Sequence, residues 1–190
     1  SVAVDSSRVT IGRPSGLALT PPQMPVAQSP SALAHYGDGP SYLNFASWGV
    51  ASGGSFLATE RKLTQIVAHA PPQMANLPRL NLARFYLANG FAAEALGLLN
   101  LLQQNDPALA GDTQLVTMKA AAKYMMGRYR DAHNDLIGPN FDSDRHAAFW
   151  RGLIEAAMEN WKDAHAHLEQ AGPVMAKYSP SWQATAMLAD

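Results

Sequence analysis

Apolar positions follow a helical period through the C-terminal part of the chain. From residue 76 onward the sequence is rich in Ala, Leu and Met, which are strong helix formers. Pro107, Pro139 and Pro180 interrupt this pattern, and proline stops or kinks a helix. We therefore predict helix pairs over about 76–109, 113–139 and 145–176, with the start of a fourth unit at 180–190.

A lone helix is predicted before these pairs. Four apolar side chains between residues 56 and 68 share one helical face, and Ser55 is a suitable N-cap. The pair Pro71-Pro72 ends the pattern. We expect residues 56–75 to form a capping helix and a linker.

Residues 1–55 have a different character, with clustered glycines and prolines. The short β-type runs 8–12 and 16–20, with turn residues between them, predict a small β-hairpin. Residues 21–25 are typical of an extended linker. Tyr42, Leu43, Phe45 and Trp48 are too many large apolar side chains for a solvated linker, so we expect a short helix or turn that packs onto the first helix of the stack.

Three short segments of the helical region align with one another. They are residues 89–95, 126–132 and 159–164, and each runs from a small or polar turn to an acidic residue followed by Ala. The three alanines, Ala95, Ala132 and Ala164, lie 37 and then 32 residues apart. Two antiparallel helices that cross closely need a small residue at the contact. Gly90 and Gly127 fit the left-handed position where the chain leaves the first helix.

On these residues the chain resembles the tetratricopeptide repeat family, whose period is about 34 residues. In the first unit, the family's signature positions hold Leu82-Ala83, Tyr86, Gly90, Ala95, Leu99, Leu102 and Asp106-Pro107. The third unit matches over 151–153 and 159–164, whereas the second has Lys123 where an aromatic residue or Leu is usual. The resemblance implies an all-α, tetratricopeptide-like helical-repeat solenoid over about 110 residues, following a short N-terminal hairpin and extended segment.

The wider run of residues 79–90 resembles large exported bacterial repeat proteins. This resemblance implies a periplasmic or cell-envelope location, with the cytoplasm as the alternative. The chain begins without Met and without the basic start and apolar stretch of a signal peptide, so we interpret it as a cut fragment or a processed product.

Composition excludes several classes of function. Charged residues make up 15% of the chain, and the formal net charge is −1, so nothing indicates a partner of nucleic acid or anionic membrane. No apolar run reaches the 18 or so residues of a membrane-spanning helix. The absence of cysteine excludes disulfides, thiol catalysis and thiolate metal sites.

The six histidines do not form a metal-binding pattern. His165 and His167 are two positions apart on a helix and point in different directions. His133 and His165 occupy equivalent places on neighbouring helices, about 8–10 Å apart, which is too far for one ion. No known zinc motif is present, and we expect no metal, no cofactor and no enzymatic activity.

Two loops have a superficial likeness to ligand sites. Residues 140–144 alternate oxygen-bearing side chains as a calcium loop does, but Arg145 stands where Gly is needed and Arg151 where a bidentate Glu should be. We expect Ser143 or Asp144 to cap the next helix instead. Residues 52–55 lack the spacing and the Lys of a phosphate-binding loop.

The resemblance places the first helix of each pair on the concave face of the stack. It implies a groove of mixed apolar and weakly basic character, suited to an extended peptide or a helix. The candidate partner-binding residues are Leu80, Arg84, Leu87, Thr117, Tyr124, His146 and Phe149.

Three functions remain open at this point. The first is a non-catalytic scaffold that binds a protein or peptide partner in the groove. The second is a structural spacer or oligomerisation element whose groove is filled by the chain's own residues 21–40. The third is an accessory domain of an enzyme whose catalytic part lies elsewhere. The final helix lacks a partner helix, so we also expect possible self-association through that end.

Overall fold

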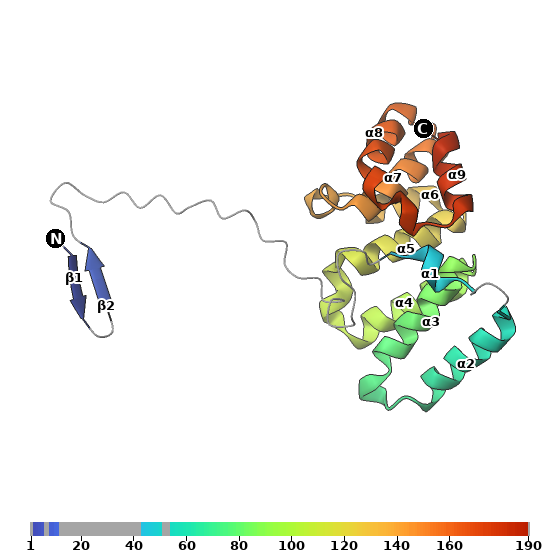
Figure 1. Ribbon diagram of the computed structural model, residues 1–190, viewed down its shortest axis with the longest axis horizontal. Coiled ribbons are helices and arrows are strands. Elements are labelled where there is room, and N and C mark those ends of the chain that lie inside the picture. The colour runs from blue at the N-terminus through green and yellow to red at the C-terminus, as the bar shows by residue number, and fades with distance from the viewer. Residues whose placement is uncertain (1, 6–7, 12–42, 51–53, 190) are drawn as a thin grey trace.

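The computed structural model describes residues 2–5, 8–11, 43–50 and 54–189. Over these residues the chain is mostly helical, and its helices pack against one another (Figure 1). The predicted strand 16–20, the linker 21–25 and the proposed groove-filling residues 21–40 lie outside the described residues.

The two described strands form an antiparallel pair. β1 (Val2–Asp5) pairs with β2 (Arg8–Ile11), with Val2 opposite Ile11. The sequence pattern instead predicts that residues 8–12 pair with residues 16–20, and that pairing stays a prediction.

Two helices precede the helix pairs. α1 (Phe45–Trp48) is capped by the Asn44 side chain, which accepts a hydrogen bond from the Ser47 N–H. α2 (Phe56–His69) is capped by Ser55, as predicted. Phe56 stacks on Phe85 in the next helix and on Phe91 in the turn after that helix, which fixes α2 against the helix that follows it.

The helix pairs follow in sequence order (Figure 1). They are α3 (Asn76–Ala88) with α4 (Ala92–Asn105), α5 (Thr113–Met125) with α6 (Tyr129–Asp135), and α7 (Arg145–Ala157) with α8 (Trp161–Ala171). α9 (Pro180–Ala189) follows α8 and packs on α7 and α8. Short 3₁₀ helices lie between elements at Pro72–Met74, Pro107–Gly111, Pro139–Phe141 and Gly172–Lys177.

The turn inside each pair uses a left-handed backbone position. Gly90 has a φ of 83° and Gly127 a φ of 73°, as the turn pattern predicts. The third pair places Glu159 there, at a φ of 65°. A side chain at positive φ carries strain, so the third turn is held by the packing of α7 against α8 rather than by its own residue preference.

Small residues allow the helices of a pair to approach closely. The three aligned alanines, Ala95, Ala132 and Ala164, are all fully buried. The large side chains that follow each turn are less buried than their apolar character suggests, and Trp161 is 59% exposed. The close crossings therefore depend on the alanines more than on the aromatic residues beside them.

Two helices approach each other closely at Gly152 in α7. A Cβ placed there would lie 2.6 Å from Cγ and 2.8 Å from Cδ2 of Leu168 in α8. We predict that Gly152→Ala lowers the free energy of unfolding by about 1–3 kcal/mol, because the two helices must separate. Urea denaturation followed by circular dichroism measures this change.

Gly97 in α4 supplies the matched control, because a Cβ there meets nothing within 4 Å. Gly97→Ala is expected to raise the free energy of unfolding by roughly 1 kcal/mol through helix propensity alone. Equal effects of the two substitutions would contradict a close crossing at Gly152.

Candidate functional site

The seven candidate residues lie on three helices of the structure, and we call their shared surface the candidate face. α3 carries Leu80, Arg84 and Leu87 at one-turn spacing, and α7 carries His146 and Phe149 at the same spacing. On α5, Thr117 and Tyr124 are two turns apart. Six of the seven are buried, and only Tyr124 is half-buried. In the structure these residues therefore form a covered face, and their role in binding a partner stays a prediction.

The chain itself covers part of this face. Residues 43–48, which we call the resident segment, place two buried apolar side chains in the core: Leu43 is fully buried and Phe45 is 2% exposed. α1 contacts α3 and the 3₁₀ helix at Gly172–Lys177, and so lies between elements about a hundred residues apart in sequence. In Figure 1, α1 crosses in front of the stack near α3 and α5.

Phe45 is the anchor of the resident segment. Its ring lies 5.4 Å from that of Tyr178, in a stacked arrangement, and 5.7 Å from that of Trp150. Trp182 of α9 adds an edge contact at 6.5 Å. Aromatic pairs in these geometries contribute about 0.5–1.5 kcal/mol each beyond the area they bury, so this cluster is a strong attachment point.

Arg84 is the charged group of the face. Its guanidinium carbon lies 5.3 Å from the ring centroid of Trp48, and its Nη1 donates to Oδ1 of Asn81 at 3.3 Å. Burial lowers the pKa of Arg84 to about 10, which leaves it charged at neutral pH. A cation over an indole face in a desolvated site is stabilised by about 2 kcal/mol, so Trp48 offsets part of the cost of burying Arg84.

His146 and Tyr178 form a buried polar pair beside the aromatic cluster. The imidazole Nδ1 lies 3.0 Å from the Tyr178 hydroxyl, and the Tyr178 ring stacks on Phe149 with centroids 3.7 Å apart. Burial is the main cause that lowers the pKa of His146 to about 4, partly opposed by Asp144. Burial also raises the pKa of Tyr178, and both groups are therefore neutral at pH 7.

Tyr124 connects α5 to the same cluster. Its ring lies 5.7 Å from Trp150 and 6.1 Å from Trp182. Burial raises the pKa of its hydroxyl. The structure thus brings Tyr124 of α5 and Phe149 of α7 into one aromatic group. This group includes three residues that the sequence analysis did not assign to the site: Trp150, Tyr178 and Trp182.

The other loops and histidines have structural partners. Asp144 caps α7 by accepting from the N–H groups of His146 and Ala147, as the sequence predicts for Ser143 or Asp144. His133 contacts Glu155 at 2.9 Å. Among the described residues, no three His, Asp or Glu side chains lie close enough together to hold a metal ion.

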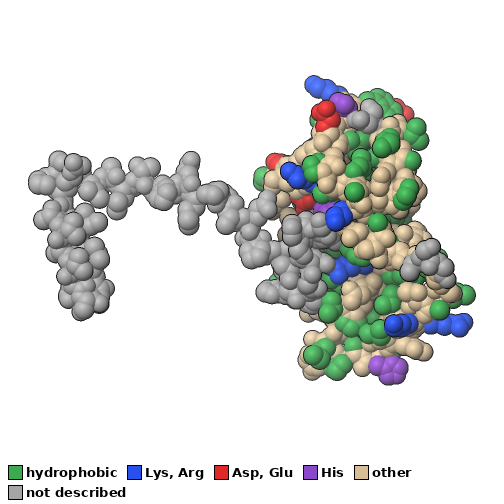
Figure 2. Space-filling view, viewed as in Figure 1, with side chains coloured by type: hydrophobic (Ala, Val, Ile, Leu, Met, Phe, Trp, Pro, Cys, Tyr) green, Lys and Arg blue, Asp and Glu red, His purple; other side chains and the backbone are tan. Residues whose placement is uncertain are grey.

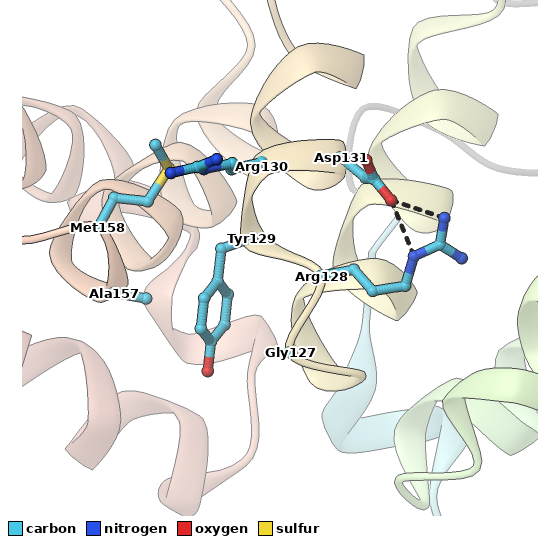
Figure 3. A pocket seen from close by; sticks show the side chains of 7 residues that line it. All are labelled: Gly127, Arg128, Tyr129, Arg130, Asp131, Ala157 and Met158. Carbon is cyan, nitrogen blue, oxygen red and sulfur yellow. Dashed lines mark hydrogen bonds and ion pairs between the residues drawn. The ribbon is translucent and has the colours of Figure 1, made fainter.

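A separate open hollow of about 520 Å³ lies at the start of α6 (Figure 3). Arg128 and Asp131 pair with each other on one side of it, at 2.6 Å, and Tyr129 projects between them and Met158. Arg128 and Asp131 neutralise each other, and Arg130 is the further charged residue that lines the hollow. Figure 2 shows that Lys and Arg side chains on the viewed face are scattered among apolar ones.

Comparisons with protein-family models, curated proteins and solved structures find no match for this chain. Within the described residues, no helix combines the length and the apolar character needed to cross a membrane.

We predict that acid destabilises the fold through His146. Its folded pKa of about 4 lies below the ordinary value of 6.5, so the folded state disfavours the charged form. The contribution of the neutral imidazole to the free energy of unfolding is fully present above about pH 6.5. It is lost as the pH falls toward 4. The loss at pH 5 amounts to about 2 kcal/mol, and urea denaturation at pH 7.5 and pH 5 measures it.

His146→Gln is the matched variant, because an amide can still hydrogen bond to Tyr178 and does not titrate. The groups around His146 are Asp144, Lys177 and Tyr178. These groups are unchanged in the variant. The difference between the two proteins in how the free energy of unfolding changes with pH therefore measures the contribution of the imidazole. Identical curves for the two proteins would show that His146 does not carry the effect.

Proposed function

We propose that this chain is a non-catalytic protein-interaction module that binds a short segment of a protein partner on the candidate face. We further propose that its helix pairs form a tetratricopeptide-like solenoid. The support for the solenoid is the order of packing, since α4 contacts α5, α6 contacts α7, and α5 contacts α7. The buried alanines at the three crossings give it further support.

One observation carries the proposed binding role: the face already holds a short segment of polypeptide by aromatic anchors. Phe45 enters the cluster of Trp150, Tyr178 and Trp182, while Trp48 covers Arg84. Grooves that recognise short segments use this combination of apolar pockets and a few polar anchors. The resident segment therefore indicates that the face binds aromatic side chains.

A structural spacer is the second candidate, and the same burial favours it. Leu43 and Phe45 lie in the core, so the resident segment can simply be part of the fold. In that case the face is filled permanently, and no partner reaches it. The two candidates differ in one measurable respect, which is whether the face takes up a segment supplied in trans.

We test this difference with the full chain and a labelled peptide that has the sequence of residues 41–50. In the Phe45→Ala chain the resident segment loses its anchor, and the peptide is expected to bind with a Kd at least tenfold lower than for the wild-type chain. Fluorescence anisotropy measures the affinity. Trp182→Ala added to Phe45→Ala is expected to weaken the binding again, because it removes one wall of the aromatic cluster.

The controls separate loss of binding from loss of folding. Trp48 is only half-buried, so Trp48→Ala is a milder way of loosening the resident segment if Phe45→Ala alters the circular dichroism spectrum. A scrambled peptide tests sequence specificity. If the peptide binds neither variant while both keep their helices, the interaction role is wrong and the spacer role stands.

A further inference from the structure

The resident segment is attached to the rest of the described structure through its side chains. Its described hydrogen bonds are internal, since the N–H groups of Ser47 and Trp48 both donate to the carbonyl oxygen of Asn44, at 3.0 and 3.1 Å. Oδ1 of Asn44 also accepts from the Ser47 N–H. Within the described residues no strand pairing joins the segment to the stack, so its recognition depends on where its side chains are placed.

A capped helical turn sets this placement. α1 has only four residues, and a helix this short is unstable without further support. The side chain of Asn44 supplies the N-cap. Phe45 and Trp48 are three positions apart, so the turn puts both rings on one side, with their centroids 5.6 Å apart. The turn thus presents two aromatic rings as one unit.

Each ring contacts a different part of the stack. Phe45 enters the aromatic cluster around Trp150 and Tyr178. Trp48 instead lies over the guanidinium of Arg84 on α3, whose carbon is 5.3 Å from the ring centroid. α1 accordingly contacts α3 as well as the 3₁₀ helix that precedes Tyr178. The observed spacing that serves both contacts is that of one helical turn.

The group that meets Trp48 is a cation in a largely desolvated site. Arg84 is 6% exposed, and burial lowers its pKa to about 10, so it carries its charge at neutral pH. A cation attracts the face of an aromatic ring, and that of Trp most strongly. It repels a second cation, and low dielectric strengthens this repulsion. The fourth position of the turn therefore favours Trp and disfavours Lys and Arg.

We propose that the partner of the candidate face is a protein segment that begins a helix with the same capped turn: an N-cap residue, an aromatic residue directly after it, and Trp three positions later. This inference rests on the proposed interaction function and names the chemistry of the partner. The resident segment is the chain's own copy of this turn, and it competes with the partner for the face.

Competition within the chain sets what the partner must offer. A segment tethered beside its pocket has an effective concentration in the millimolar range. A second copy of this chain presents the same four-residue turn and has no advantage over it. A partner whose helix continues arrives with the turn already ordered, and it loses less conformational entropy on binding. Among the described atoms, a Cβ at Gly49 would meet only the Phe45 carbonyl oxygen, at 3.7 Å, which leaves room for a helix-forming residue.

The experiment measures labelled peptides on the full chain carrying Phe45→Ala, or Trp48→Ala where the first variant loses helicity. The reference peptide has the sequence of residues 41–50. Exchanging Ser47 and Trp48 in the peptide keeps its composition but puts the two rings two positions apart, on different sides of a helix. We expect the exchanged peptide to bind about tenfold more weakly by fluorescence anisotropy, because only one ring reaches its site.

Two peptides that differ at Asn44 test the turn itself. Asn44→Ala removes the cap and is expected to weaken binding about fivefold, the usual effect of a lost N-cap. Asn44→Ser keeps a capping hydroxyl and is expected to bind like the reference. Recognition of an extended segment predicts equal affinities for the three peptides, and that result contradicts the inference.

A double-mutant cycle tests the contact with Arg84. Trp48→Leu in the peptide is expected to weaken binding, and this loss is expected to be about three- to tenfold smaller when the chain also carries Arg84→Met. Arg79→Met is the matched control, because Arg79 is on the same helix and donates to Asn76. It should leave the loss unchanged. If Arg84→Met alters the circular dichroism spectrum, Trp48→Lys in the peptide replaces it, and is expected to bind more weakly than Trp48→Leu.

A longer peptide tests displacement in the wild-type chain. It has residues 41–48 followed by a helix-forming tail of Ala, Glu and Lys. We expect it to bind the wild-type chain about tenfold more tightly than the reference peptide, because its turn is ordered before binding. Equal affinities would show that an ordered helix gives no advantage, and that the partner is not recognised as the start of a helix.

The outcomes separate this inference from the proposed function. If the reference peptide does not bind the loosened chain, the proposed interaction function fails. If it binds and the exchanged and Asn44→Ala peptides bind as tightly, the face accepts aromatic side chains without recognising a turn, and only the inference is overturned. A stable complex between two wild-type copies at micromolar concentration, measured by light scattering, would make the occupant a second copy and would also overturn it.

Discussion

The insertion of Phe45 among Trp150, Tyr178 and Trp182 is the contact on which the rest of the structure depends. It joins residues more than a hundred positions apart in sequence. In an ideal repeat stack each unit touches only its neighbours, and stability is a sum of local terms. Here the segment before α2 also contacts α3 and the 3₁₀ helix before α9. The resident segment thus links helices at the two ends of the stack, and it covers part of the candidate face.

Features that depend on local sequence could be predicted from the sequence. Ser55 and Asp144 cap their helices, and Gly90 and Gly127 adopt the left-handed turn, because each acts within three or four residues of its own position. Glu159 escaped prediction because the third turn is held by packing rather than by residue preference. The helical period also placed the candidate residues on shared faces, since the period alone fixes which side chains point the same way.

Burial of the candidate face could not be predicted in the same way. The period shows that Arg84 and Leu87 share a side of α3, but not what lies over that side. The resident segment was identified as too aromatic for a linker, yet nothing local shows that Phe45 enters a pocket formed by α7 and α9. Tyr178 is also absent from the sequence-based site, because it follows a 3₁₀ helix with no apolar period. Contacts of this kind arise from long-range packing, which leaves no periodic signal.

The polarity of the face distinguishes the two proposed roles. A spacer needs only a well-packed interior, and apolar residues of similar volume supply this at least as well as buried charged and polar groups do. The face instead keeps a desolvated Arg84 and a neutral His146. A surface that must recognise a partner needs directional groups of this kind even at the expense of stability, so this polarity favours binding over a purely structural role.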